Sequence, residues 1–260
     1  MNGAGNNHLG VNLAFTKFIF VALAGDDEAA RARLRAAASV IQRGFFNDFE
    51  SEGRESVPQE TIQFFVNEQG RDQPGLAGTR YVIQISSKYR PSLNDAETEL
   101  RRRLQDTASI TALDGAVRNP QYTSAEMHAY AYQPAIGRQS GRSQGTVIIV
   151  PMSKTAEWWL KHPLERHTYF YPSSNGSGPV KGHARSAHEG ISTIYRRLYY
   201  NPDGVNRADE FDFITYFECA DEHLPTFDKV RQALRDPSQN PEWSYVVEGP
   251  EWRGRRVLRW

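Results

Sequence analysis

Phe211-Asp-Phe-Ile-Thr-Tyr-Phe-Glu218 is the most strongly patterned stretch of this 260-residue chain. Its first, third, fifth and seventh positions hold three phenylalanines and a threonine, so bulky residues recur with a period of two. Successive side chains of a strand point to opposite faces, and aromatic and β-branched residues favour such a pleated surface. We therefore predict a strand over 211–217 at the centre of the C-terminal half.

The residues on either side of this strand alternate between strand and helix patterns. An apolar run at 147–150 predicts a strand, and the large residues of 224–234 recur at helical spacing and predict a helix. The remaining patterns of this half predict a short helix over 157–164, a Ser/Gly loop over 171–179, a helix over 183–191, a strand over 195–200 and a last strand over 243–247.

The N-terminal half shows a similar order of patterns. An apolar run over 11–23 predicts a strand, and Asp26 and Asp27 are placed to open the helix that follows, since acidic residues stabilise a helix N-terminus. One face of that helix carries Leu34, Ala38, Ile41 and Phe45. Further strands are predicted at 61–66, 81–85 and 110–117, with a helix that starts at 94 or 95.

Two β-α-β-β-type halves predict an α+β fold built from tandem ferredoxin-like repeats. Their sheets would pair into a β-barrel-like core with outer helices, the dimeric α+β barrel type. We predict an N-terminal half over 1–136 and a C-terminal half over 146–260. The Gly/Ser/Gln/Arg-rich stretch 137–145 has the composition of a flexible linker between them.

The composition excludes several classes of function. Lys+Arg and Asp+Glu both number 31, so no net field attracts nucleic acid or an anionic membrane, and we expect neither partner. Cys219 is the single cysteine, which excludes an intrachain disulfide and predicts a buried, inert thiol. The apolar segment Phe18–Ala24 is interpreted as a first strand rather than a signal peptide, which favours the cytoplasm and leaves the periplasm open.

The residues that could carry chemistry lie between 150 and 218. Lys154 and the adjacent Trp158 and Trp159 precede His183, and Arg196 follows that histidine by thirteen positions. This order suits a buried planar cofactor with an imidazole on one side and a guanidinium on the other. Taken one at a time, such residues are more often structural or exposed. His183 and His188 lie five apart and point in different directions on a helix, which is poor spacing for zinc.

Together these residues resemble the haem-binding C-terminal half of the chlorite dismutase family. The matching motifs are Pro151-x-x-Lys154-x-x-x-Trp158-Trp159, the His183-to-Arg196 spacing and the complete string Asp212–Glu218. A fainter match, Gly115–Tyr122, is similar to the connection between the family's two halves. The resemblance covers about 147–247.

The resemblance implies a haem b enzyme that converts chlorite to chloride and dioxygen. His183 would be the proximal iron ligand, with Glu242 and Lys154 hydrogen-bonded behind it. Arg196 would be the distal arginine that meets the small anionic substrate. Further haem or propionate contacts are implied for Trp158, Trp159 and Tyr122. The family's longer members form homopentamers, so a homopentamer is expected here.

Three alternatives stay open. The family's coproheme decarboxylases carry a tyrosine before the Pro-x-x-Lys run, where this chain has Val150, and often a residue other than arginine at the position of Arg196. The loop 171–179 lengthens the Trp-to-His spacing, which leaves His167 or His188 as other ligands. The unusual turn 201–210 and the insertion 236–240 also leave room for a peroxidase or for a non-enzymatic tandem ferredoxin-like protein.

Overall fold

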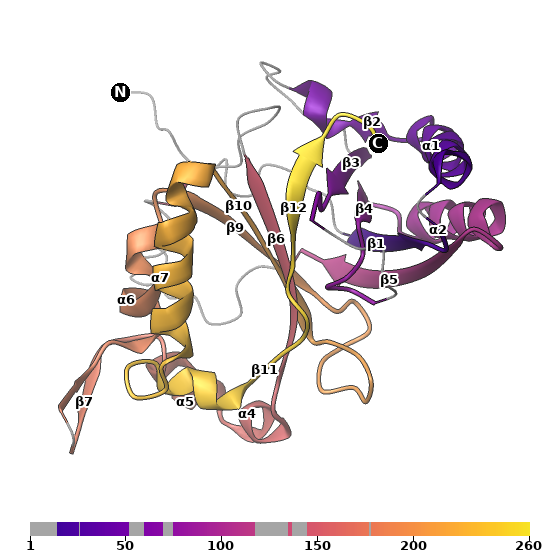
Figure 1. The fold of residues 1–260 in the computed structure, drawn as a ribbon. Coiled ribbons are helices and arrows are strands. Elements are labelled where there is room, and N and C mark those ends of the chain that lie inside the picture. The colour runs from indigo at the N-terminus through magenta and orange to yellow at the C-terminus, as the bar shows by residue number, and fades with distance from the viewer. Residues whose placement is uncertain are drawn as a thin grey trace, which may run out of the picture.

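The computed structural model describes residues 15–25, 27–51, 60–69, 75–117, 135–136, 145–176 and 178–260. Its dominant feature is a ten-stranded sheet with helices on its outer faces (Figure 1). The N-terminal half runs through β1 (Phe15–Leu23), α1 (Glu28–Gln42), β2 (Phe46–Asn47), the 3-10 helix η2 (Asp48–Ser51), β3 (Thr61–Val66), β4 (Tyr81–Ser87), α2 (Arg90–Leu104) and β5 (Ala108–Ala116).

The C-terminal half has more elements, several of them short. It runs through β6 (Thr146–Lys154), α4 (Ala156–Leu160), α5 (Pro163–Thr168), β7 (Ser173–Asn175), β8 (Gly178–Val180), α6 (Gly182–Ala187), η4 (His188–Gly190), β9 (Ile194–Tyr200), β10 (Phe213–Cys219), η5 (Asp221–His223), α7 (Leu224–Arg235), η6 (Pro241–Tyr245), β11 (Val246–Glu248) and β12 (Trp252–Val257).

The two halves share one strand order. The N-terminal strands lie in the order β5-β1-β4-β3, and the C-terminal strands lie in the order β11/β12-β6-β10-β9. In both halves the fourth strand therefore flanks the first, and the third separates the first from the second. This antiparallel arrangement is the ferredoxin-like one. The predicted α+β fold of tandem ferredoxin-like repeats is confirmed.

Two junctions join the halves into one sheet. Residues 252–254 of β12 pair with β6, and residues 255–257 of the same strand pair with β3. On the other side, Ala116 of β5 pairs with Tyr200 of β9. The inner faces meet in a buried cluster drawn from both halves, which includes Phe18, Phe20, Phe65, Val82, Val147, Ile149, Tyr195, Tyr199, Ile214, Tyr216 and Trp252. The sheet is thus folded back on itself around this core.

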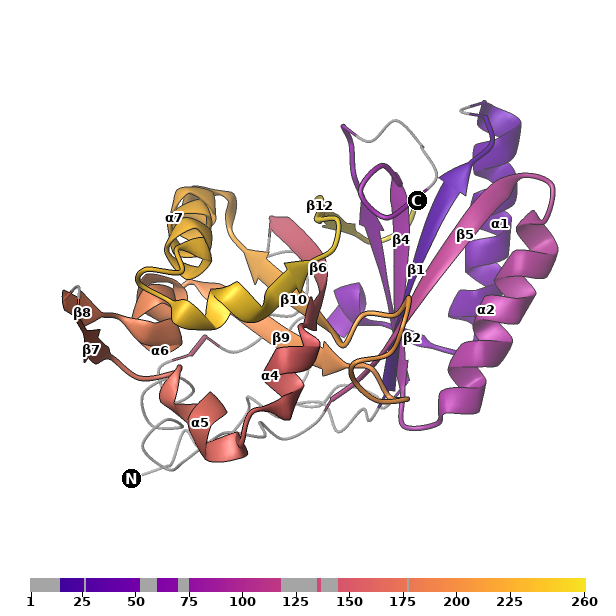
Figure 2. The ribbon, with the colours of Figure 1, turned by 90° about the horizontal axis from the view of Figure 1, so that it is seen from below.

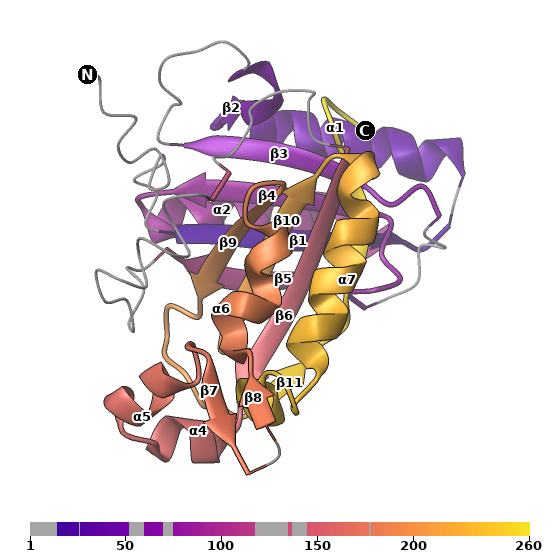
Figure 3. The ribbon, with the colours of Figure 1, turned by 90° about the vertical axis from the view of Figure 1, so that its left-hand side faces the viewer.

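Helices cover the outer face of each half. The helices α1 and α2 lie side by side on the N-terminal strands (Figure 2) and bury Leu34, Leu93 and Leu100 against them. The Asp27 carboxylate accepts a hydrogen bond from the Ala30 amide at 2.7 Å, which caps α1 as the sequence pattern indicates. On the C-terminal strands, α6 and α7 occupy the equivalent face (Figure 3), where Phe227 is buried.

Several sequence predictions of local structure hold and several need correction. The strands at 61–66, 81–85 and 195–200 and the helix at 224–234 are present with small changes of boundary. The helix predicted over 157–164 is two helices, because Pro163 starts a second one. The predicted loop 171–179 contains the β7–β8 hairpin. The last strand predicted over 243–247 is wrong: 241–245 form η6, and the sheet ends on β11 and β12.

Two predictions about burial also hold. Phe18 to Leu23 form part of the central strand β1 and are almost fully buried, as expected of a first core strand. Cys219 is fully buried, and burial raises the pKa of its thiol to about 11, so the thiol is inert at neutral pH. Within the described ranges, no helix is long and apolar enough to cross a bilayer. Most of the predicted linker 137–145 lies outside the described residues, so the division of the chain stays a prediction.

Candidate functional site

A three-residue polar network lies between the end of β6 and the start of α6. The His183 Nδ1 atom lies 3.0 Å from Glu242 Oε2, and Lys154 Nζ donates to Glu242 Oε1 at 2.5 Å. Only 8 % of the Lys154 side chain and 18 % of the Glu242 side chain are exposed to solvent. The sequence motif thus places its histidine, lysine and glutamate in direct contact.

The charges of this network direct a proton of the histidine toward Glu242. Burial alone would raise the pKa of the Glu242 carboxyl group, but the charges and hydrogen bonds of His183 and Lys154 outweigh it and hold that pKa well below its usual range. Burial lowers the pKa of Lys154, against the opposing influence of Glu242. An ionised carboxylate can only accept, so Nδ1 of His183 carries a proton and points it at Glu242.

The backbone around His183 fixes the direction of its ring. Gly182 has φ +68°, and a Cβ at that residue would lie 2.3 Å from the Tyr171 carbonyl oxygen. The His183 amide donates to the Tyr169 carbonyl at 3.1 Å. The His183 ring stacks on Phe170 with an interplanar angle of 16°. A glycine is required here because its neighbours leave no room for a side chain.

Asp212 anchors the other end of the site and was not assigned a role from the sequence. Its Oδ2 atom accepts from the Lys154 amide at 2.7 Å and from Trp159 Nε1 at 2.9 Å. Its Oδ1 atom accepts from the Asn206 amide at 2.5 Å, and Asp212 is only 1 % exposed. An acidic residue at the head of a buried strand was the available signal, because a buried carboxylate needs such donors.

The two adjacent tryptophans have different surroundings. Trp158 is 2 % exposed and lies beneath the Lys154 ammonium group, 4.3 Å from its ring centroid. Trp159 is half-buried, with the Arg166 guanidinium 5.4 Å from its ring. The structure places both beside the His183 network. Their roles as cofactor contacts stay predictions.

Arg196 lies on the sheet face that α6 and α7 cover. Ile194, two positions earlier on β9, packs in the same cluster as Phe227 of α7, whereas Tyr195 belongs to the inner core. Alternation along the strand therefore turns Arg196 toward the helices and Arg197 toward the inner core. Arg196 itself is exposed. This face also carries partly exposed apolar residues, namely Leu198, Phe213 and Phe217.

The other candidate residues are placed as follows. His167 lies in the last turn of α5 and packs edge-on against Tyr171, with ring centroids 5.0 Å apart. His188 begins η4 and is exposed. The hydrogen bond to Glu242 is made by His183, which is the pattern expected of an oriented metal ligand. Tyr122 lies outside the described residues. No group of three or more metal-binding side chains gathers anywhere in the described part of the chain.

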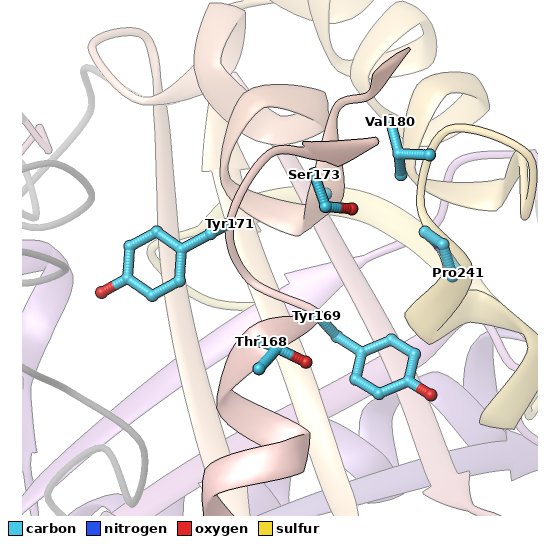
Figure 4. Close-up of a pocket in the computed structure, with 7 residues that line it drawn as sticks. Thr168, Tyr169, Tyr171, Ser173, Val180 and Pro241 are labelled. Atoms are coloured by element: carbon cyan, nitrogen blue, oxygen red, sulfur yellow. The ribbon is translucent and has the colours of Figure 1, made fainter. Parts of the chain in front are cut away.

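A small pocket lies on the side of α6 that faces the β7–β8 hairpin (Figure 4). Its volume is about 130 Å³, and it is lined by Thr168, Tyr169, Tyr171, Ser173, Val180, Gly182 and Pro241. Sites for drug-sized ligands measure roughly 300–1,000 Å³. This pocket is therefore too small for a macrocycle and is separate from the face that carries Arg196.

Known structures share this architecture over almost the whole chain. Chlorite dismutase from Candidatus Nitrospira defluvii, in a variant with one arginine replaced by alanine, superposes with a TM-score of 0.68 at 17 % identity and covers 96 % of this chain and 94 % of its own. The same enzyme in complex with imidazole gives a TM-score of 0.67 at 16 % identity, with 96 % and 94 % coverage.

A third structure of that enzyme, with one tryptophan changed to phenylalanine and cyanide bound, gives a TM-score of 0.66 at 16 % identity and covers 98 % of this chain and 95 % of its own. No family model matches the sequence. The likeness in fold extends to the N-terminal half, where the sequence carries no clear motif. The chain therefore has the α+β fold of the chlorite dismutases.

Proposed function

We propose that the protein is a haem b-dependent oxidoreductase that converts chlorite to chloride and dioxygen. The observation that carries the proposal is the contact between His183, Glu242 and Lys154. In this contact the imidazole of His183 is held through Nδ1 on α6, a helix that covers the sheet face to which Arg196 belongs. The fold shared with the chlorite dismutases supports it.

The residues present fit a haem. The Glu242 carboxylate occupies Nδ1 of His183, and among the described residues Nε2 has no hydrogen-bond partner. An imidazole fixed through its other nitrogen is the usual proximal ligand of haem iron. The partly exposed Leu198, Phe213 and Phe217 lie on the neighbouring sheet face and offer an apolar wall for a macrocycle. His183 would hold the iron, with Trp158 and Trp159 nearby.

When bound, the haem would supply the redox and oxygen-transfer chemistry. The Glu242 carboxylate retains the proton on Nδ1 and pushes electron density onto His183, which stabilises more oxidised iron. Lys154 neutralises part of the Glu242 charge and fixes its position. The guanidinium group of Arg196 presents several donors in a plane, so it could bind chlorite and retain the oxyanion formed from it.

Oxygen evolution tests this proposal. Haem-loaded wild-type protein should release dioxygen from chlorite, and Arg196→Ala should keep its haem but lose more of the intermediate oxyanion to solvent and inactivate sooner. Arg197→Ala is a matched control, because its side chain points to the other face of β9. Haem-loaded protein that releases no dioxygen would contradict the proposed reaction.

Coproheme decarboxylation is the second candidate reaction of this fold. Val150 stands where those enzymes carry a tyrosine. Its side chain is 3 % exposed and is packed in an apolar cluster. The structure therefore offers no phenol there. Coproheme-loaded protein treated with peroxide should keep its propionate mass; loss of that mass would favour the decarboxylase. Protein that binds neither cofactor would favour a non-enzymatic role.

We further propose that the subunits assemble into a homopentamer in the cytoplasm. Leu160 and Leu164 are 86 % and 72 % exposed on the neighbouring helices α4 and α5. Large apolar side chains so exposed are typical of surfaces that another protein covers. Light scattering during gel filtration measures the assembly, and Leu160→Lys combined with Leu164→Lys should weaken it. A monomeric wild type would exclude the pentamer.

A further inference from the structure

Two tyrosines and a tryptophan pack together just outside the His183 network. Trp158 contacts Tyr169 and Tyr245 with ring centroids 5.4 Å and 5.6 Å apart. The two tyrosine rings lie 5.6 Å apart, and their hydroxyl oxygens are separated by 3.3 Å. Lys161 covers the pair, with Nζ 4.8 Å from the Tyr245 ring centroid.

This cluster is in contact with the proposed iron ligand. The Lys154 ammonium group lies over Trp158 and donates to Glu242, which in turn binds His183. Each of these contacts is a hydrogen bond or an ion-to-ring contact. An unbroken series of close contacts therefore leads from His183 to Tyr169 and Tyr245.

The series runs from the interior to the surface. Trp158 is 2 % exposed, whereas Tyr169 and Tyr245 are half-buried. A phenol that gives up an electron must also release its proton, and partly exposed hydroxyl groups can release it to water. The two tyrosines are thus placed as an end point for oxidation.

The small pocket provides a place for an external electron donor. Tyr169 forms part of its wall, and Figure 4 shows its ring beside Pro241. The pocket volume of about 130 Å³ is close to the roughly 150 Å³ of a cavity known to hold benzene. Hydroxyl groups of Thr168 and Ser173 and the apolar Val180 and Pro241 surround this space, which suits a ring with one hydroxyl group.

We infer that Trp158, Tyr169 and Tyr245 relay single electrons from a small phenol in this pocket to the His183 site. The inference rests on the proposed haem site. In each of two steps, Tyr169 would give up one electron through Trp158 toward the His183 site, where peroxide is the final oxidant, and would release its hydroxyl proton to water. A phenol in the pocket would then return one electron and one proton to the Tyr169 radical and become a phenoxyl radical. Hydrogen peroxide and two phenols thereby give two phenoxyl radicals and two waters.

Electron paramagnetic resonance after rapid freezing tests the relay. Haem-loaded wild type mixed with hydrogen peroxide should show a tyrosyl radical, which Tyr169→Phe combined with Tyr245→Phe should abolish. Trp158→Phe should lower the radical yield and slow phenol oxidation by about tenfold, equivalent to about 1.4 kcal/mol in barrier height. Tyr89→Phe is the matched control, because Tyr89 also lies beside a lysine but is an exposed residue of the N-terminal half.

A second pair of variants tests the pocket separately. Ser173→Phe should fill the pocket and raise the KM for a small phenol such as guaiacol several-fold, while the radical signal formed without phenol stays unchanged. Ser174→Phe is the control, since the next residue of β7 points to the opposite face. Equal KM values in both variants would exclude the pocket as the donor site.

The outcomes separate this inference from the proposed haem site. Protein that shows no Soret band after haemin addition would overturn both. Protein that binds haem through His183, yet gives the same radical and the same phenol oxidation rate in wild type, Trp158→Phe and the double tyrosine variant, would overturn the relay alone. The Soret spectrum of each variant is recorded first, so that loss of haem is not mistaken for loss of the relay.

Discussion

The N-terminal and C-terminal halves have one strand order and very different helical layers. In the N-terminal half, a short connection leads from β1 to α1, and two long helices bury most of an apolar face, with Ile110 and Ala112 of β5 left partly exposed. In the C-terminal half, residues 155–181 lie between β6 and the short helix α6 and hold α4, α5 and the hairpin (Figure 3). The shorter helices on this half leave Leu198, Phe213 and Phe217 partly exposed. One scaffold thus serves stability in one half and a candidate site in the other.

The buried charged residues of the two halves also differ in their surroundings. Buried charges of the C-terminal half include Lys154, Asp212 and Glu218, and two of these three belong to the site. Lys17 is the buried lysine of the N-terminal half, and it is paired with Glu97 and Asp114 at 2.5 Å and 2.9 Å. We therefore expect substitutions in the two halves to have different consequences.

The largest effect is expected where the two halves join. Arg256 of β12 pairs with Glu218 of β10, and Tyr216 also donates to that carboxylate; Glu218 and Arg256 are 0 % and 6 % exposed. Removing one partner of a buried pair leaves an uncompensated charge, so Glu218→Gln should lower the free energy of unfolding by about 3–5 kcal/mol. Urea denaturation measures the change.

Arg255→Met provides the comparison for that prediction. Arg255 is the neighbouring residue, and it pairs with Asp221 at 2.8 Å on the surface, where 46 % of its side chain is exposed. An exposed pair contributes about 0–1 kcal/mol. Equal losses in the two variants would contradict a special role for the buried junction.

The second prediction compares the two outer faces directly. Leu34, on the buried face of α1, is 1 % exposed, whereas Leu198 on β9 is only partly buried. Leu34→Ala should therefore cost about 3 kcal/mol, near the lower end of values for fully buried leucines, and Leu198→Ala should cost about 1 kcal/mol. Leu198→Ala should instead weaken haem binding, which Leu34→Ala should leave unchanged. The reverse pattern would mean that Leu198 supports the core rather than the cofactor face.

The third prediction concerns how the stability of the fold changes at acidic pH. The pKa of Glu242 is held well below its usual range, so its ionised form stabilises the fold above about pH 4.3, the ordinary value for this carboxyl group. That contribution is lost as the pH falls further, toward the folded-state pKa. Glu242→Gln should cost about 2 kcal/mol at pH 7, since it removes a hydrogen bond from a charged group.

The pH dependence supplies its own control. The difference in stability between wild type and Glu242→Gln should be constant from pH 7 to pH 5 and should narrow below pH 4, as the wild-type carboxylate takes up a proton. Thermal unfolding at a series of pH values measures it. A difference that grows on acidification would contradict the sign of the pKa change.

The smallest effect is expected at Trp159. Trp159→Phe removes the hydrogen bond to Asp212 Oδ2, which the Lys154 amide still contacts. Because one donor remains and the ring volume is largely retained, the free energy of unfolding should fall by about 1 kcal/mol. Trp158→Phe should reduce the cation–ring contact with Lys154 instead. If Trp159→Phe lowers the free energy of unfolding more than Glu242→Gln does, the contacts of Asp212 stabilise the site more than those of Glu242.

Much of the fold could be predicted from the sequence because its signals are local. The alternation of 211–218 and the helical spacing of 224–234 identify single elements, and their repeated order gives the tandem arrangement. The β7–β8 hairpin could not be predicted in this way, since serine and glycine are typical of loops. The final strands were misplaced because Pro241 starts a 3-10 helix through residues that also suit a strand.

The candidate site could likewise be predicted only in part. The His183–Glu242–Lys154 contacts were implied by the family resemblance, and they join residues 59 and 88 positions apart. The roles of Asp212 and of the Tyr169–Tyr245 pair were not predicted. These contacts are also long-range, since they join residues 53 and 76 positions apart. Asp212 and Trp159 belong to the matching motifs, but nothing in those motifs indicated that the two are partners.

A haemin titration followed by its visible spectrum tests the central claim most directly. It would compare wild type with His183→Ala and with His188→Ala, a histidine on the adjoining η4 that does not contact Glu242 in the network described above. We expect a Soret band in wild type and in His188→Ala, and its loss or a large fall in affinity in His183→Ala. An unchanged band in His183→Ala, or none in wild type, would contradict a haem site built on His183.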